Sequence, residues 1–161
     1  PLRSRMTPRK VLTLLFLASL LGIGYLSMNA APLLSDQSYS YHGGTKWHTN
    51  VTEAQQIAER QDKPMLIYFW TTWCTYCEDY NQKVYSDAAV RDDLDEFVLV
   101  AVNLDDGSPS ATRLQQRYDA TYPPQHVAVT PDGETLVEIN GYAKKKAFRQ
   151  YLERAQRRYD G

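Results

Sequence analysis

The residues in this sequence whose types and spacing best support chemistry are two cysteines separated by two residues, Cys74 and Cys77. They are the only cysteines in the 161-residue chain. A disulfide between them would close a very short loop, which adds little stability by restricting the unfolded chain. The pair therefore predicts thiol chemistry or metal binding rather than a structural cross-link.

The sequence around the pair places it where a buried strand ends and a helix begins. Residues 65–70 (MLIYFW) are a short apolar run, typical of a strand that is buried on both faces. The chain then turns into a helix predicted to end near Val84. Because a helix N-terminus stabilises an anion, we expect Cys74 to attack a partner's disulfide as a thiolate. Cys77, one helical turn further on, would resolve the mixed disulfide.

Along the rest of the chain, hydrophobic patterns and turn signals predict helices that alternate with strands. Asn50 and Glu53 have capping-box spacing, and residues 131–133 (PDG) predict a turn between two short strands. Parallel strands with crossover helices and a final antiparallel hairpin predict an α/β fold, a three-layer sandwich with a central mixed sheet. The other predicted elements are an edge strand over 46–49, helices over 51–61, 86–94 and 110–119, strands over 97–103, 126–130 and 135–139, and an amphipathic helix over 143–159.

The first part of the chain predicts a membrane anchor. Residues 1–10 are basic, and residues 11–28 carry no charge. Eighteen helical residues rise about 27 Å, close to the roughly 30 Å hydrocarbon core of a bilayer. Basic residues before the span predict that the remainder lies outside the cytoplasm. Residues 29–45 are predicted as a linker and residues 46–161 as the domain.

Whether the anchor is cleaved is a separate question. Signal peptidase requires small residues at positions −3 and −1. Cleavage after Ala30 or Ala31 would place Met28 or Asn29 at −3, so an uncleaved anchor is favoured. The two readings predict a protein on the extracytoplasmic face of the membrane, or one exported after signal cleavage.

The charge distribution argues against nucleic acid as a partner. Four of the eighteen basic residues precede the first acidic residue, Asp36, so the chain beyond it has a net charge of −5. Binding to phosphates requires a clustered basic excess, which this domain lacks. The sequence also has no glycine-rich phosphate loop and no haem-attachment motif, so no organic cofactor is predicted.

A family resemblance agrees with this reading. Residues 63–77 (KPMLIYFWTTWCTYC) resemble the active-site region of the thioredoxin superfamily. Together with residues 84–90 (VYSDAAV) and 97–105 (FVLVAVNLD), they are most similar to the C-terminal periplasmic domain of the thiol:disulfide interchange protein DsbD and its exported thioredoxin-like relatives. The resemblance covers residues 47–159 and implies the thioredoxin fold and thiol–disulfide oxidoreductase activity.

The resemblance also implies further site residues. The cis-proline loop that faces the cysteines in this family would lie at Pro124, with Pro123 as the alternative. In the family, the residue before this proline binds the substrate backbone, but Pro123 has no N–H to donate. The aromatic residues expected to contact a partner are Trp73, Tyr76 and Tyr122.

Proton transfer is expected to depart from the family pattern. Thioredoxins carry a buried Asp six residues before the first cysteine, and this chain has Tyr68 there. Glu78 or Asp79 could serve as the proton relay in its place. The favoured alternative is that both are surface acids in the first turn of the helix, where they interact favourably with the helix dipole.

Three functional classes follow from these patterns. The favoured class is an extracytoplasmic oxidoreductase that reduces disulfides of exported proteins with electrons from a membrane donor protein; an oxidase or isomerase is the alternative. Thr75-Tyr76, between the cysteines, contains neither the His nor the Pro typical of strong oxidants. The second class is a copper or zinc carrier using His42, His48 or His126, of which only His126 is expected near the pair. The third class is a redox-inert binding scaffold.

Overall fold

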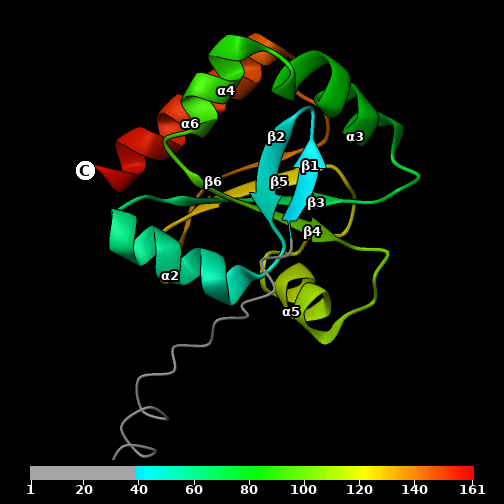
Figure 1. The fold of residues 1–161 in the computed structure, drawn as a ribbon, viewed down its shortest axis with the longest axis horizontal. Helices are drawn as coiled ribbons and strands as arrows, with labels where there is room; N and C mark the ends of the chain where they lie inside the picture. The colour runs from blue at the N-terminus through cyan, green and yellow to red at the C-terminus, as the bar shows by residue number, and fades with distance from the viewer. Residues whose placement is uncertain (1–38) are drawn as a thin grey trace, which may run out of the picture. The chain divides into compact units, whose positions relative to one another are not determined.

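The computed structural model describes residues 39–161, which form one sheet of six strands with helices on both faces (Figure 1). The strand order is β1-β2-β4-β3-β5-β6. The strands are β1 (Tyr39–His42), β2 (Thr45–His48), β3 (Met65–Trp70), β4 (Val98–Asn103), β5 (Gln125–Val129) and β6 (Thr135–Asn140). The helices are α2 (Val51–Gln61), α3 (Thr75–Tyr80), the π-helical turn η1 (Asn81–Tyr85), α4 (Ala88–Leu94), α5 (Pro109–Arg117) and α6 (Lys145–Tyr159).

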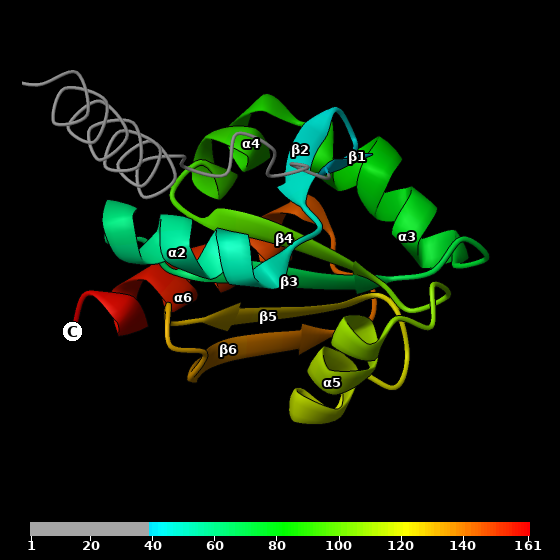
Figure 2. The same cartoon turned by 60° about the horizontal axis from the view of Figure 1, so that its bottom comes forward.

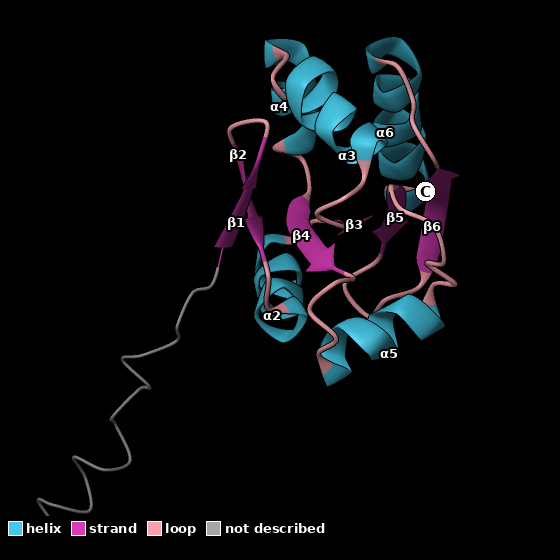
Figure 3. Ribbon diagram, turned by 90° about the vertical axis from the view of Figure 1, so that its right-hand side faces the viewer, coloured by secondary structure: helices cyan, strands magenta, loops and turns pink. Residues whose placement is uncertain are grey.

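Helices cover the two faces of the sheet in separate groups. Figures 2 and 3 show α2 and α5 on one face and α3, α4 and α6 on the other. The central strand β3 runs parallel to β4 and antiparallel to β5. This arrangement confirms the predicted α/β three-layer sandwich with a mixed sheet.

Strand β3 is buried on both faces, as its apolar run predicts. Leu66 and Tyr68 belong to the core under α3, α4 and α6, whereas Ile67 and Phe69 belong to the core under α2 and α5. All four side chains are fully buried. Strand alternation therefore gives the sheet two cores, and the one that holds Tyr68 also holds Cys74 and Cys77.

The boundary between linker and domain differs from the prediction. Residues 29–45 are predicted as a linker, yet β1 lies within this range and pairs antiparallel with β2. Gly43 and Gly44 take positive φ angles of 58° and 84° in the turn, which glycine accommodates best. His42 is buried, so this hairpin belongs to the folded domain. The tether prediction is therefore wrong for residues 39–45, where alternating residues around Gly-Gly form a hairpin. Residues 29–38 of the predicted linker lie outside the described residues.

Several helix boundaries shift by one or two residues. Asp87, rather than Ser86, caps α4, because its carboxylate accepts hydrogen bonds from the amides of Ala89 and Val90. Ser108 caps α5, which begins at Pro109 instead of residue 110. The helix that carries the cysteines continues beyond α3 as η1.

The predicted basic segment over residues 1–10 and the anchor over residues 11–28 lie outside the described residues. Between residues 39 and 161, no helix is both long enough and apolar enough to cross a membrane.

Candidate active site

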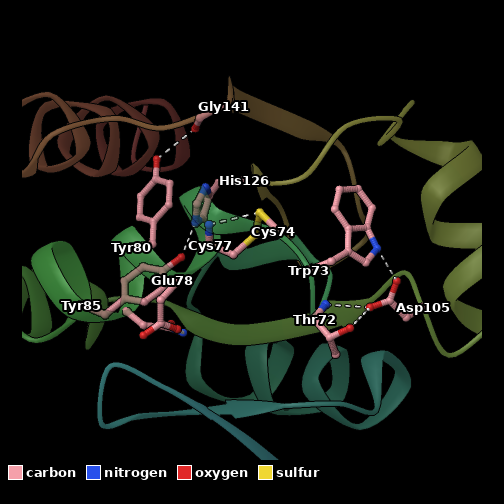
Figure 4. Close-up of a disulfide and its surroundings, with 11 residues drawn as sticks. Thr72, Trp73, Cys74, Cys77, Glu78, Tyr80, Tyr85, Asp105, His126 and Gly141 are labelled. Atoms are coloured by element: carbon pink, nitrogen blue, oxygen red, sulfur yellow. Dashed lines mark hydrogen bonds between the residues drawn. A yellow bond between two sulfur atoms is a disulfide. The ribbon is translucent and has the colours of Figure 1, made fainter.

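Cys74 and Cys77 form a disulfide at the junction between β3 and α3, with their Cα atoms 5.2 Å apart (Figure 4). Cys74 is the N-cap of α3, and the backbone amide of Cys77 donates a hydrogen bond to its Sγ atom at 3.1 Å. Cys74 is 8% exposed and Cys77 is 3% exposed. A thiolate at Cys74 would accept the same amide hydrogen bond, which stabilises the negative charge.

The loop before Cys74 is held by Asp105, which follows β4. Its Oδ2 atom accepts hydrogen bonds from the Thr72 amide at 2.6 Å and from the Thr72 hydroxyl at 2.8 Å. Its Oδ1 atom accepts a hydrogen bond from the indole of Trp73 at 3.0 Å. These bonds, chiefly those from Thr72, lower the pKa of Asp105. Figure 4 shows the carboxylate bridging Thr72 and Trp73 beside the disulfide.

Asp105 is not among the site residues predicted above, although its position after β4 is a signal for it. Strands β3 and β4 are parallel, with Trp70 opposite Asn103, so their carboxyl ends lie at the same edge of the sheet. A polar residue just after β4 is therefore placed beside the loop that follows β3. We infer that Asp105 positions the motif without contacting the sulfur atoms.

The hydrogen bond from the Trp73 indole to the Asp105 carboxylate is expected to depend on pH. Because the pKa of Asp105 is lowered in the folded protein, this bond is fully formed above about pH 4. It is lost as the pH falls through the lowered value. The indole N–H proton resonance of Trp73 should move upfield over that range. In Asp105→Ala, whose side chain cannot accept a hydrogen bond, it should lie at the upfield position already at neutral pH.

The control for this prediction is Asp106→Ala, which removes a neighbouring carboxylate that accepts a hydrogen bond from the Ser108 amide. Its Trp73 resonance should titrate as in the wild type. A Trp73 resonance that is unchanged in Asp105→Ala would contradict the positioning role of Asp105.

The three aromatic residues predicted to contact a partner are all exposed. Trp73 is 71% exposed, Tyr76 58% and Tyr122 81%. The Tyr76 ring stacks on Tyr142, with ring centroids 5.9 Å apart and an interplanar angle of 16°. Large aromatic side chains of this kind are enriched at protein interfaces.

The structure has a cis peptide bond between Pro123 and Pro124, where the resemblance places the family's cis-proline loop. Pro124 is buried, and its carbonyl oxygen accepts a hydrogen bond from the Gly141 amide at 2.8 Å. Pro123 is half-buried.

The two acids considered as a proton relay both make contacts along their own helix. Glu78 accepts a hydrogen bond from the side chain of Gln82 at 2.6 Å. Asp79 forms an ion pair with Lys83 at 2.6 Å. Such contacts between residues four positions apart are typical of acids on a helix surface.

Beside the disulfide lies a buried core that contains the aromatic residues Trp47, Tyr68, Tyr80, Tyr85 and Phe148. Tyr68, at the position of the family's buried Asp, stacks on His126 with ring centroids 4.8 Å apart. Burial raises the pKa of Tyr68 and lowers the pKa of His126 to about 3. Both side chains are therefore uncharged at neutral pH.

The histidines considered as metal ligands lie in different environments. His42 and His126 are buried among aromatic rings, and burial lowers the pKa of His42 to about 4. His48 contacts the ring of Tyr39. Within residues 39–161, no three His, Cys, Asp or Glu side chains are grouped so that they could hold a metal ion.

Comparisons with known proteins place this geometry in a family. A model of the thioredoxin-like domain matches residues 51–156. The thiol:disulfide interchange protein DsbD of Photorhabdus laumondii is 23% identical over 107 residues, which is 65% of this chain and 19% of that protein. The protein of the same name from Ralstonia nicotianae is 25% identical over 108 residues, 66% of this chain and 18% of that protein. The chain thus spans about a fifth of the length of these curated relatives.

Solved structures show the same fold. The oxidised C-terminal domain of DsbD from Neisseria meningitidis superposes with a TM-score of 0.59 at 20% identity, covering 65% of this chain and 90% of that domain. A thioredoxin from Thermus thermophilus superposes with a TM-score of 0.61 at 27% identity, covering 68% of this chain and 85% of that protein.

Proposed function

The chain belongs to the thioredoxin-like family, and we propose that this thiol–disulfide oxidoreductase reduces disulfides of exported proteins outside the cytoplasm. The observation that carries the proposal is the Cys74–Cys77 disulfide at the start of α3, with Cys74 capping the helix and Cys77 enclosed behind it. This arrangement separates an attacking sulfur from a resolving one.

The reaction transfers two electrons and two protons in each cycle. A donor dithiol first reduces the Cys74–Cys77 disulfide and becomes a disulfide itself. The Cys74 thiolate then attacks one sulfur of the target disulfide and forms a mixed disulfide, while the other target sulfur leaves and takes up a proton. Cys77 next attacks the Sγ atom of Cys74, releases the target as a dithiol and restores the internal disulfide.

Three observations support the reducing direction and the extracytoplasmic location. The similar proteins named DsbD are thiol:disulfide interchange proteins, and Thr75-Tyr76 lacks the His or Pro typical of strong oxidants. The apolar segment over residues 11–28, with basic residues before it, supports an anchor that leaves the domain outside the cytoplasm. We propose a membrane protein dithiol as the electron donor.

In this proposal the exposed side chains of Trp73, Tyr76 and Tyr122 contact the partner around its disulfide. The loop at Pro123 and Pro124 lies along the bound partner segment. Because Pro123 has no N–H, one backbone hydrogen bond to that segment is missing, and recognition depends more on side-chain contacts.

The direction of exchange can be measured with the purified protein. In one reaction, the reduced oxidoreductase is mixed with an exported target protein whose disulfide is intact. In the other, the oxidised oxidoreductase is mixed with the same target in its dithiol form. We expect reduction of the target to be the faster reaction. Faster oxidation of the reduced target would overturn the proposal in favour of an oxidase or isomerase.

A further inference from the structure

One buried polar side chain has no role in the reaction described so far. His126 lies on β5 directly opposite Tyr68 on β3, and it is fully buried. The two rings stack at 4.8 Å with an interplanar angle of 12°. The ring of Phe148, from α6, lies 5.0 Å away on the same side of the sheet.

Only one of the two ring nitrogens of His126 has a partner. Its Nε2 atom is hydrogen-bonded to the hydroxyl of Tyr85, but its Nδ1 atom is buried without a hydrogen-bond partner among the described residues. Burying a ring nitrogen without a hydrogen-bond partner costs free energy, because the hydrogen bond it makes to water in the unfolded chain is not replaced. The oxidised protein therefore carries a polar atom that needs a partner.

The resolving cysteine belongs to the same core as the aromatic rings that surround His126. Tyr80, one helical turn after Cys77, has its ring centroid 4.6 Å from that of His126. Figure 4 shows His126 on the Tyr80 side of the disulfide, with Trp73 and Asp105 on the opposite side. Cys77 is enclosed in the same core, so the thiol it becomes on reduction is also a buried polar group.

We propose that His126 is a positioning residue for Cys77, and that its Nδ1 atom accepts a hydrogen bond from the Cys77 thiol when the disulfide opens. The Nε2 atom then carries the ring proton and donates a hydrogen bond to the hydroxyl oxygen of Tyr85. This role rests on the proposed cycling of the disulfide. Burial lowers the pKa of His126, which keeps the imidazole neutral and its Nδ1 lone pair free to accept the bond.

The proposal has a definite thermodynamic sign. The hydrogen bond exists only in the reduced protein, so His126 favours the dithiol over the disulfide. When Cys77 later attacks Cys74, it gives up this proton, and the departing partner sulfur takes one up. The exchange is balanced without any further reactant.

The test compares the thiol–disulfide equilibrium of three variants. His126→Phe keeps an aromatic ring but removes both nitrogens, and we expect it to favour the disulfide about tenfold more, a shift of about 30 mV to more negative potential. His126→Gln keeps a side-chain acceptor and should remain near the wild-type value. Phe148→Leu alters the packing around His126 but keeps its nitrogens, and its equilibrium should also be unchanged.

Each outcome is informative. An unshifted equilibrium in His126→Phe, or an equal shift in all three variants, would overturn the role of Nδ1. A wild-type protein that does not exchange disulfides at all would instead overturn the proposed function. Thermal unfolding of each variant identifies any that fails to fold.

A measurement on the wild-type protein avoids substitutions altogether. With ¹⁵N-labelled histidine, the Nδ1 resonance of His126 should move on reduction in the direction of a hydrogen-bonded acceptor, while His48 serves as the reference. Identical His126 resonances in the oxidised and reduced proteins would contradict the proposal.

Discussion

Replacement of Cys77 by Ala is expected to turn the protein into a trap that holds its partner through Cys74. The variant keeps the N-cap position of Cys74, so it still attacks a disulfide. It lacks the resolving thiol, whose effective concentration within the site far exceeds that of millimolar external thiol. We expect release of the partner to slow by at least roughly a thousandfold. The covalent complex would be measured by mass spectrometry and by its loss on addition of dithiothreitol.

The matched control is Cys74→Ala, which leaves Cys77 as the only cysteine. Because Cys77 lies inside α3 and lacks the N-cap position that stabilises a thiolate at Cys74, this variant should form much less mixed disulfide. Equal trapping by the two variants would contradict the assigned roles, and so would turnover by Cys77→Ala at the wild-type rate.

Substitution of Gly43 by Ala is expected to produce the largest loss of stability that we predict. A Cβ atom at this position would lie 2.6 Å from the backbone oxygen of Asn81 and 2.6 Å from the Cβ atom of Tyr85. The positive φ angle of 58° adds strain of about 1–2 kcal/mol. Overpacking adds about 1–3 kcal/mol, so we expect the free energy of unfolding to fall by roughly 3 kcal/mol in urea titrations.

Gly44→Ala is the control for this prediction. Gly44 also has a positive φ angle, but its Cβ would meet only Arg91, at 4.0 Å. This variant should lose only the backbone strain, about 1–2 kcal/mol. Equal losses in the two variants would show that the hairpin does not pack closely on η1, the turn that continues the helix from Cys77.

Much of the fold can be predicted from the sequence because local patterns agree with tertiary burial. The apolar run of β3, the capping residues of α2 and the turn between β5 and β6 each determine an element without reference to the rest of the chain. The position of Cys74 at a helix N-terminus follows from the strand that precedes it. These features identify the reactive pair before the fold is known.

The supporting residues of the site cannot be predicted in this way. Asp105 reaches Trp73 across 32 positions, and Tyr85 reaches His126 across 41. Such contacts depend on the order of the strands in the sheet. His126 occurs in an apolar strand, where a histidine gives no local sign that one of its nitrogens has a partner and the other has none.

The reduction potential of the Cys74–Cys77 pair tests the central claim most directly. The protein would be equilibrated in glutathione and dithiothreitol buffers, and the fraction of disulfide measured by thiol labelling. A potential near or below about −230 mV is the predicted result, because it places the pair among thioredoxin-like reductants. A potential between about −120 and −180 mV would place it among oxidants and isomerases and would contradict the proposed reduction of exported proteins.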